Sequence, residues 1–296
     1  MDKTEPLRWT DHLLNRVISL LPHHLVSRIV LQLTRSEMPL VRNSVIGVYT
    51  RLFKLNLEEA LEPSLSSYRS MNALFTRALK PTARPIDPDP QSLVSPADGN
   101  ISEFGNIQGQ QLLQAKGYYY DLNKLLGGDN TLAAPFREGQ FATIYLSPRD
   151  YHRVHMPLTG TLTDMIYIPG RLFSVSPKTT RMVPEIFTRN ERVACLFDTT
   201  FGRMAVILVG AINVAAIETV WAGLVTPPRH QQVVHTHYTD NITLQKGAEM
   251  GRFNMGSTAI VLIEGRNLDM DTALEPGQKM QMGVRLGCFR SPEKQI

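Results

Sequence analysis

Four of the ten residues from 81 to 90 are prolines, a density that neither a helix nor a central strand tolerates. The sequence differs in character on the two sides of this stretch. Before it, apolar residues recur at helical spacing. After residue 91, short apolar or alternating runs are separated by Gly, Pro, Asn and Asp. We therefore expect a boundary here between a helical part and a β-rich part.

The predicted fold class is α+β, with N-terminal amphipathic helices followed by a mostly antiparallel β domain of sandwich or barrel-like type. Three domain-level segments follow: a basic helical region at 1–57, a helical and Pro-rich connection at 58–90, and a β-rich domain at 91–296. The clearest strand candidates are the runs 141–147, 204–209 and 259–263.

The N-terminal region is predicted to form three short helices, at about 7–21, 24–34 and 40–55. Residues 1–55 hold eight Lys or Arg and four Asp or Glu, so the formal net charge of +4 arises in this segment. One interpretation is a helical subdomain packed on the rest of the protein, and the other is an interfacial membrane anchor. Binding of nucleic acid is not expected, because no aromatic platform accompanies the basic residues.

Several classes of protein are disfavoured by what the sequence lacks. Two cysteines in 296 residues do not make a disulfide framework, so a reducing compartment is expected. No metal-ligand spacing is present, and we expect no metal. There is no secretory signal, and the longest apolar run, 204–217, is too short to span a bilayer and contains Gly210 and Asn213.

Three clusters carry residues suited to chemistry. Asp98 and Gly99 form a pair that is common in turns. His152 and His155 lie three residues apart, where they suit general base chemistry, a metal pair or a surface feature. A helical turn would bring the two histidines together, whereas an extended chain would point them to opposite sides.

The third cluster is the dipeptide Gly256-Ser257, just before the apolar run 259–263. Its simplest interpretation is a loop entering a strand. The nucleophile-elbow pattern G-x-S-x-G is absent, because Met255 and Ala259 occupy the flanking glycine positions. A serine hydroxyl can instead attack the carbonyl of the residue before it, and glycine leaves that approach open.

Together these clusters resemble the phosphatidylserine decarboxylase family. Gly256-Ser257-Thr258, preceded by Phe253 and followed by a hydrophobic strand, resembles the family's self-cleavage motif. Four other segments match in order: 75–86 (FTRALKPTARPI, with Thr82 where Gly is usual), 95–99 (SPADG), 151–157 (YHRVHMP) and 167–175 (YIPGRLFSV). The resemblance covers about residues 70–287.

The resemblance implies a charge relay in which Asp98 orients His155 and His155 takes the proton of Ser257. Cleavage between Gly256 and Ser257 would give a β chain, 1–256, and an α chain, 257–296, capped by a pyruvoyl group derived from Ser257. That covalent cofactor, in place of pyridoxal phosphate, would form a Schiff base with phosphatidylserine and release CO2 to give phosphatidylethanolamine.

The resemblance assigns further residues and partners. His152 would assist decarboxylation or reprotonation, and Ser174 would contact the substrate. Thr258 either donates a hydrogen bond near the scissile carbonyl or simply begins the strand. The implied partners are phosphatidylserine and an anionic membrane surface, with the α and β chains remaining associated and pairing as a homodimer of α/β units.

A lipid substrate favours the membrane-anchor interpretation of the N-terminal helices. The expected location is peripheral, on the cytoplasmic face of the cell membrane if the source is bacterial. Two other functions fit the same residues. One is a membrane-associated serine hydrolase without self-cleavage, and the other is a non-enzymatic β-rich lipid-binding module.

Overall fold

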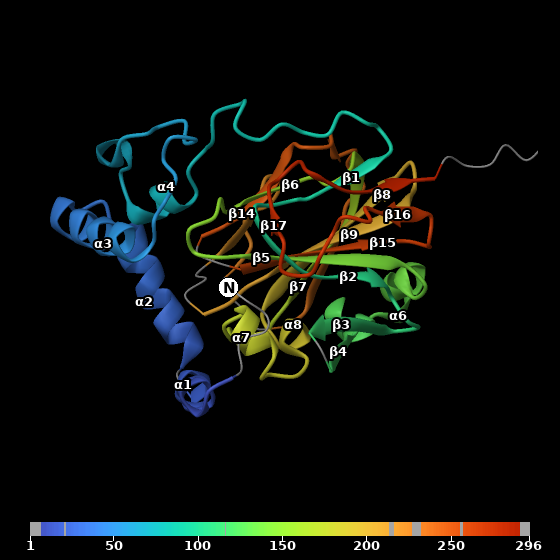
Figure 1. The fold of residues 1–296 in the computed structure, drawn as a ribbon, viewed down its shortest axis with the longest axis horizontal. Coiled ribbons are helices and arrows are strands. Elements are labelled where there is room, and N and C mark those ends of the chain that lie inside the picture. The colour runs from blue at the N-terminus through green and yellow to red at the C-terminus, as the bar shows by residue number, and fades with distance from the viewer. Residues whose placement is uncertain are drawn as a thin grey trace, which may run out of the picture.

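The computed structural model describes residues 7–20, 22–115, 117–212, 216–226, 232–254 and 257–290. The N-terminal helices stand to one side of a β-rich body, as Figure 1 shows. They are α1 Trp9–Leu20, α2 His23–Arg35, α3 Pro39–Leu52, the 3-10 turn η1 Leu65–Ser67 and the short α4 Met71–Phe75. The α+β fold class is thereby confirmed.

Prolines and a serine set where these helices begin. Pro22 precedes α2, Pro39 is the first residue of α3, and the Ser70 hydroxyl caps α4 by accepting from the Ala73 amide at 3.1 Å. Helix was also expected through most of 57–80, but the structure has only η1 and α4 there. Pro63 and the serines that follow it favour turns over a continuous helix.

Helix α2 is amphipathic in the opposite sense to an ordinary surface helix. Its apolar stripe faces outward, with Leu25, Ile29 and Leu33 exposed by 56%, 49% and 47%. Its inward side is polar, since His23 and Ser27 are buried. A soluble protein normally buries the apolar side of such a helix, so this stripe calls for an apolar partner outside the described chain.

The same helices are tied to the β-rich body by polar contacts. His24 Nε2 lies 3.0 Å from the Gly170 carbonyl oxygen, and Arg35 pairs with Glu218 at 3.1 Å. The Tyr49 hydroxyl of α3 donates to the Pro148 carbonyl. The N-terminal helices therefore pack on the body through polar contacts, and they also expose apolar surface to the outside. No helix in the described ranges is both long and apolar enough to cross a membrane.

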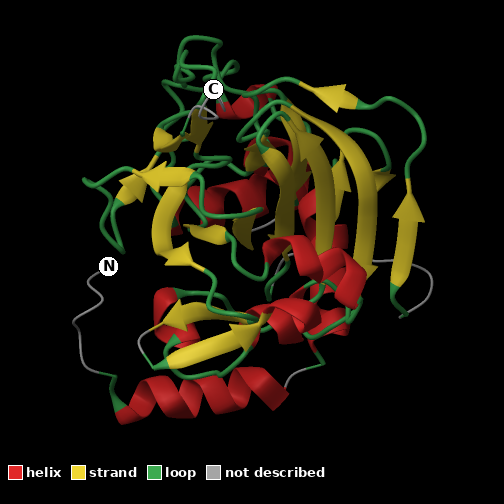
Figure 2. Cartoon of the chain, turned by 90° about the vertical axis from the view of Figure 1, so that its right-hand side faces the viewer, coloured by secondary structure: helices red, strands yellow, loops and turns green. Residues whose placement is uncertain are grey.

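The body is built from antiparallel sheets, which curve around the core in Figure 2. The largest has nine strands: β12 Val234–His237, β7 Gly160–Ile168, β8 Arg192–Thr199, β9 Gly202–Val209, β15 Ser257–Ile263, β5 Gln140–Leu146, β2 Gly99–Asn106 and β17 Lys279–Met280 in order, with β13 Thr243–Leu244 beside β7.

Smaller sheets and helices complete the body. One sheet is β11 Gly223–Leu224, β10 Ile217–Thr219, β14 Glu249–Phe253 and β6 Arg153–His155; another is β1 Ser92–Val94, β18 Arg285–Phe289 and β16 Leu268–Met270; a hairpin joins β3 Gln111–Ala115 to β4 Tyr118–Asp121. The short helices are α5 Leu122–Leu125, α6 Asn130–Ala133, η2 Ala134–Phe136, α7 Pro177–Thr180 and α8 Ile186–Arg189.

The predicted apolar run 259–263 lies in β15, at the centre of the nine-stranded sheet between β9 and β5. Its side chains from Ala259 to Ile263 are buried, which explains a run that is apolar on both faces. Strand β14 belongs to the four-stranded sheet and ends at Phe253, only a few residues before β15 begins. The segment that joins the two strands therefore passes from one sheet to the other.

Candidate active site

The predicted cleavage site lies at this passage between sheets. Ser257 is the first residue of β15, and its backbone pairs with Leu146 of β5. Gly256 and the side chain of Ser257 lie outside the described residues. The next residue, Thr258, is fully buried, and its hydroxyl has no hydrogen-bond partner among the described residues. A buried polar atom of this kind is available to a ligand or a water.

Asp98 is held by an arginine that comes from the Pro-rich connection. Arg84 Nε donates to Asp98 Oδ1 at 2.8 Å, and Nη2 donates to Oδ2 at 2.5 Å. The Met282 amide also donates to Oδ1, at 2.9 Å. Burial opposes the charge of Arg84, yet hydrogen bonds to Asp98 and Glu59 raise its pKa above the ordinary value. The buried carboxylate is therefore paired and hydrogen-bonded.

The residue after Asp98 must be glycine. Gly99 has a φ of +154°, and a Cβ there would lie 2.2 Å from the Tyr145 carbonyl oxygen. The pair was interpreted from the sequence as a turn, but Gly99 instead begins strand β2, pressed against β5. The close approach fixes Asp98 at the end of this strand.

His155 lies on β6 and is fixed by its backbone and by both ring nitrogens. Its amide donates to the Pro96 carbonyl at 2.8 Å, which links the histidine segment to the Asp98 segment. Nδ1 lies 2.8 Å from the Gly247 carbonyl oxygen, and Nε2 lies 3.0 Å from the Tyr151 hydroxyl. Burial lowers the pKa of His155, although the charge of Asp98 acts in the opposite direction.

These contacts define the protonation state of His155. A carbonyl oxygen only accepts, so Nδ1 must carry the hydrogen that reaches Gly247. With the pKa lowered, the ring is neutral near pH 7 and Nε2 carries no hydrogen. Burial raises the pKa of Tyr151 to about 12, so its hydroxyl stays protonated and donates to Nε2. The arrangement leaves Nε2 of His155 able to act as a base.

The described contacts do not include the hydrogen bond from His155 to Asp98 that a charge relay of triad type predicts. Asp98 bonds to Arg84 and Met282, while the position that a triad carboxylate fills at Nδ1 of His155 is taken by the Gly247 carbonyl. Burial lowers the pKa of His155 overall, and the charges of Glu249 and, less strongly, Asp98 oppose that lowering.

His152 is fully buried just before β6. Its ring centroid lies 4.0 Å from that of Phe75, and Nδ1 lies 2.8 Å from the Asp150 carbonyl oxygen. Burial lowers the pKa of His152 to about 3, so this ring too is neutral. Its Nε2 has no partner among the described residues. The His152 carbonyl accepts from the Phe253 amide, which ties it to the end of β14.

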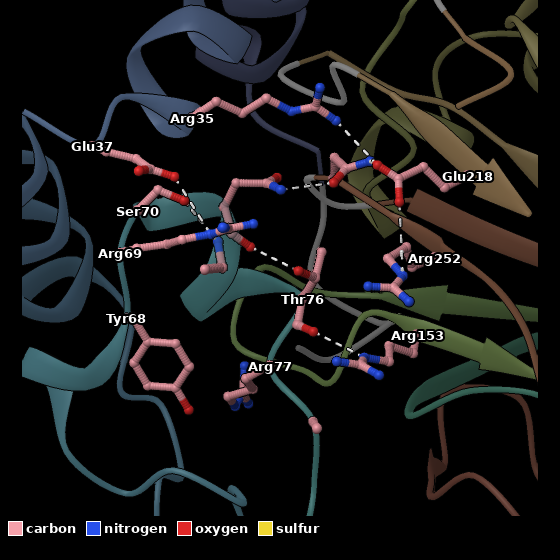
Figure 3. A pocket seen from close by; sticks show the side chains of 14 residues that line it. Arg35, Glu37, Tyr68, Arg69, Ser70, Thr76, Arg77, Arg153, Glu218 and Arg252 are labelled. Atoms are coloured by element: carbon pink, nitrogen blue, oxygen red, sulfur yellow. Dashed lines mark hydrogen bonds and ion pairs between the residues drawn. The ribbon is translucent and has the colours of Figure 1, made fainter. Parts of the chain in front are cut away.

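An arginine-rich pocket of about 540 Å³ opens beside these residues, between the helical part and the four-stranded sheet (Figure 3). Asn254, which follows β14, lines this pocket and accepts from the Asn72 side chain at 2.9 Å. The pocket therefore reaches the chain three residues before Ser257. Its arginines are Arg35, Arg69, Arg77, Arg153 and Arg252.

Ser174 lies in the segment before α7, where its hydroxyl accepts from the Ser176 amide at 3.4 Å. Ser176 lines a second pocket, of about 410 Å³, which Phe53 of α3 and Tyr145 of β5 also border. Tyr145 pairs through its backbone with Thr258, so this pocket flanks the start of β15. Among the described residues, no cluster of three or more His, Cys, Asp or Glu is arranged to hold a metal.

Sequence reasoning gave no role to three residues that the structure makes important: Arg84, Tyr151 and Gly247. Arg84 and Tyr151 lie inside the motifs that carried the family resemblance, but nothing in those motifs indicates their partners. Gly247 contributes only a carbonyl and is 92 residues from His155. No residue type at that position could have signalled the contact.

Comparison with known proteins identifies the family of the chain. A family model described as phosphatidylserine decarboxylase matches residues 71–288, and a second, described as PSD, matches residues 18–54. Three relatives have the name phosphatidylserine decarboxylase proenzyme. Those from Alkalilimnicola ehrlichii, Bordetella avium and Pseudomonas putida are 53%, 56% and 51% identical, over 95%, 90% and 91% of this chain and 96%, 91% and 95% of their own lengths.

A β-rich body in which the sequence Gly-Ser precedes a buried strand fits the class of self-processing enzymes. The chain belongs to the phosphatidylserine decarboxylase family. The predicted enzyme class, a pyruvoyl-dependent carboxy-lyase made as a proenzyme, is confirmed by this membership. Membership in this family favours the decarboxylase among the three functions considered from the sequence. It disfavours the serine hydrolase and the lipid-binding module.

Proposed function

We propose that this protein cuts itself between Gly256 and Ser257 and then decarboxylates phosphatidylserine, with His155 as the base for cleavage. The observation that carries the proposal is the protonation state of His155. Its Nδ1 hydrogen is committed to the Gly247 carbonyl, so Nε2 is unprotonated; it accepts a hydrogen bond from the Tyr151 hydroxyl, which the Ser257 hydroxyl would replace for cleavage. Asp98 lies in the segment that the His155 amide contacts through Pro96, and Arg84 holds the Asp98 carboxyl in place.

The cleavage chemistry follows from the dipeptide. Ser257 Oγ gives its proton to His155 and attacks the Gly256 carbonyl, and the peptide bond becomes an ester as the amide nitrogen takes a proton. Loss of the Ser257 α-proton then expels Gly256 as a carboxylate and leaves dehydroalanine at position 257. Water hydrolyses the imine tautomer of that residue and releases ammonia, which leaves a pyruvoyl group at the start of the α chain.

The surroundings of position 257 fit such a group. Thr258 Oγ1 and His152 Nε2 are buried polar atoms without partners among the described residues, and each is suited to a carbonyl or a water beside it. Once formed, the pyruvoyl group supplies an electron sink for the loss of CO2. After CO2 leaves, a proton must be added to the substrate carbon, and His152 is the residue that would transfer it. Ser174 remains a predicted substrate contact.

The sheet accounts for how the α and β chains stay together after cleavage. Residues 257–290 supply β15, β16, β17 and β18, and β15 pairs along its length with β5 and β9 of the β chain. Separation would break those ladders and expose the buried face of β15. For the homodimer of α/β units, the support is the exposed edge strand β12, to which a second copy could add a strand.

The outward apolar stripe of α2 supports docking on a membrane. With the exposed Leu40, Val48 and Leu52 of α3 it forms a surface that lipid would cover. Docking is peripheral, on the cytoplasmic face in a bacterial host. The basic excess of residues 1–55 attracts an anionic leaflet, and phosphatidylserine is an anionic lipid.

Incubation with phosphatidylserine labelled at the serine carboxyl tests the activity. The wild-type chain should release labelled CO2 and form phosphatidylethanolamine, and the Ser257→Ala chain should do neither. Binding of vesicles without any release of CO2 by the wild-type chain would overturn the proposed function. The His155→Gln chain provides a second control, because it keeps the Ser257 side chain but lacks the base.

A further inference from the structure

The arginine-rich pocket carries more positive charge than the protein neutralises. Five arginines line it (Figure 3). Arg35 and Arg252 share Glu218, Arg153 and Arg252 share Glu249, and Arg69 pairs with Glu37 at 3.4 Å. Three carboxylates thus face five guanidinium groups. The excess of two positive charges makes this a place for an anion.

Arg77 is the pocket arginine that makes no ion pair within the described residues, although the charge of Asp98 acts on it from a distance. Its side chain lines the pocket, and the residue is only 4% exposed. Within the described part of the chain it has no ion pair, and its Nε has no hydrogen-bond partner. A buried guanidinium cannot be hydrated as a surface one is, so an arrangement of this kind is stable when a bound anion supplies the missing partner.

Two further arginines line the same pocket as Arg77. Arg153 comes from β6, and Arg252 comes from β14 on the opposite wall from α4, as Figure 3 shows. Arg153 is anchored by donating to the Thr76 carbonyl at 2.9 Å, directly before Arg77 in the chain. Planar guanidinium groups converging from two walls match the oxygens of a phosphate better than a single point charge does.

The position of the pocket ties the anion to the reaction. Asn254 lines it, and three extended residues span at most about 11 Å to Ser257. The serine amine of a phospholipid headgroup is separated from the phosphorus by only a few bonds. On its other side the pocket reaches Arg35, at the end of α2, whose apolar stripe faces outward. A headgroup arriving from a membrane would meet these arginines first.

The substrate offers two anionic groups, and the chemistry selects one. An arginine on the carboxylate would stabilise the group that must leave as CO2, which lowers the ground state and opposes the reaction. An arginine on the phosphodiester binds ground state and transition state alike and positions the amine. We propose that Arg77, with Arg153 and Arg252, forms the subsite that holds the phosphodiester of the headgroup, an assignment that rests on the proposed decarboxylase activity.

Kinetics of the processed enzyme test this subsite. Arg77→Met should cut itself fully and keep its melting temperature, since an uncompensated charge is removed. Its KM for phosphatidylserine in mixed micelles should rise about tenfold or more, because loss of a hydrogen bond to a charged group weakens binding by about that factor. Its kcat should change little. Arg266→Met is the charge-matched control: Arg266 pairs with the exposed Glu138 and lines a different pocket, and its KM should not change.

Binding to the uncut Ser257→Ala chain separates this idea from the proposed activity, because it requires no turnover. Glycerophosphoserine, the soluble headgroup, should raise the melting temperature of Ser257→Ala but not of Ser257→Ala with Arg77→Met. Stabilisation by inorganic phosphate alone would identify a site for free phosphate and overturn the headgroup assignment. An absence of headgroup binding would also overturn it, whether or not the wild-type chain decarboxylates lipid.

Two further outcomes would contradict the proposal. An unchanged KM in fully cut Arg77→Met would show that the arginine does not touch the substrate. Unfolding of Arg77→Met would show that the guanidinium supports the fold. Arg77→Lys then serves as the second variant, because it keeps the charge but loses the planar fork. A folded Arg77→Lys with wild-type KM would likewise show that the guanidinium does not hold the headgroup.

Discussion

Arg84 holds the carboxylate of Asp98 through hydrogen bonds of 2.8 and 2.5 Å, and both side chains are more than nine-tenths buried. Little water is present to screen the pair. Removal of either partner would leave the other charge buried and unpaired, which is far more costly than breaking a surface ion pair. The Pro-rich connection is therefore coupled to the active site through this contact.

Replacement of Arg84 by Gln should lower the free energy of unfolding by about 3 kcal/mol, the loss typical of a broken buried pair. Urea unfolding in the Ser257→Ala background measures this in a single uncut chain. Glu59→Gln is the matched control: Glu59 also bonds to Arg84, but its side chain is 33% exposed, so the loss should stay below about 1 kcal/mol. Equal losses in the two variants would contradict the special role of Asp98.

The two histidines should separate cleavage from decarboxylation. His155→Ala should leave an uncut chain, because it removes the Nε2 base. His152→Ala should still cut itself and yet release less than about one hundredth of the wild-type CO2, the contribution typical of general acid–base catalysis. Gel analysis and CO2 release measure the two steps. A His152→Ala chain that stays uncut would place His152 in the cleavage relay instead.

The buried neutral histidines also predict acid lability. The pKa of His152 is lowered from 6.5 to about 3, so the unfolded chain binds the proton first as pH falls. Stability is therefore full above pH 6.5 and declines below it, with His152 alone removing about 2 kcal/mol between pH 7 and pH 5. Urea midpoints of Ser257→Ala at the two pH values measure this. Adding His152→Gln should flatten the dependence, and an equally steep decline would contradict the assignment.

The outward stripe of α2 predicts a membrane contact. Replacing Leu25, Ile29 and Leu33 by Ser should reduce flotation with phosphatidylserine vesicles at least tenfold, because each side chain loses its burial in lipid. Leu25→Met, Ile29→Leu and Leu33→Met together form the control, since they keep the stripe apolar and should keep binding. Flotation of the Ser variant at the wild-type level would show that α2 is not the anchor.

Local patterns in the sequence predicted much of the fold. The helices at 9–52 and the strands β5, β9 and β15 follow from apolar spacing and from the prolines that separate elements. The sequence did not predict the polar inward face of α2, because amphipathic spacing gives an apolar side without saying what covers it. Helix was expected too widely between 57 and 80, where Pro63 and the serines after it favour turns.

Much of the candidate site could be found in the sequence, but its connections could not. Asp98, His152 and His155 were identified from short motifs. The partners Arg84, Gly247 and Tyr151 depend on how β2, β6 and the loop before β14 meet in space. Such contacts join residues that no local pattern relates. Only the folded chain assigns the Nδ1 hydrogen of His155 to a carbonyl and leaves Nε2 as an acceptor, bonded to the Tyr151 hydroxyl.

The central claim is that Ser257 cuts its own chain and becomes the cofactor, and the mass of the C-terminal fragment tests it most directly. Denaturing mass spectrometry of active protein should find a 40-residue α chain, 257–296, whose first residue is a pyruvoyl group with no free amine. The Ser257→Ala chain should stay at full length. An intact chain of 33.2 kDa in protein that decarboxylates phosphatidylserine, or a fragment beginning with an ordinary serine, would contradict the account.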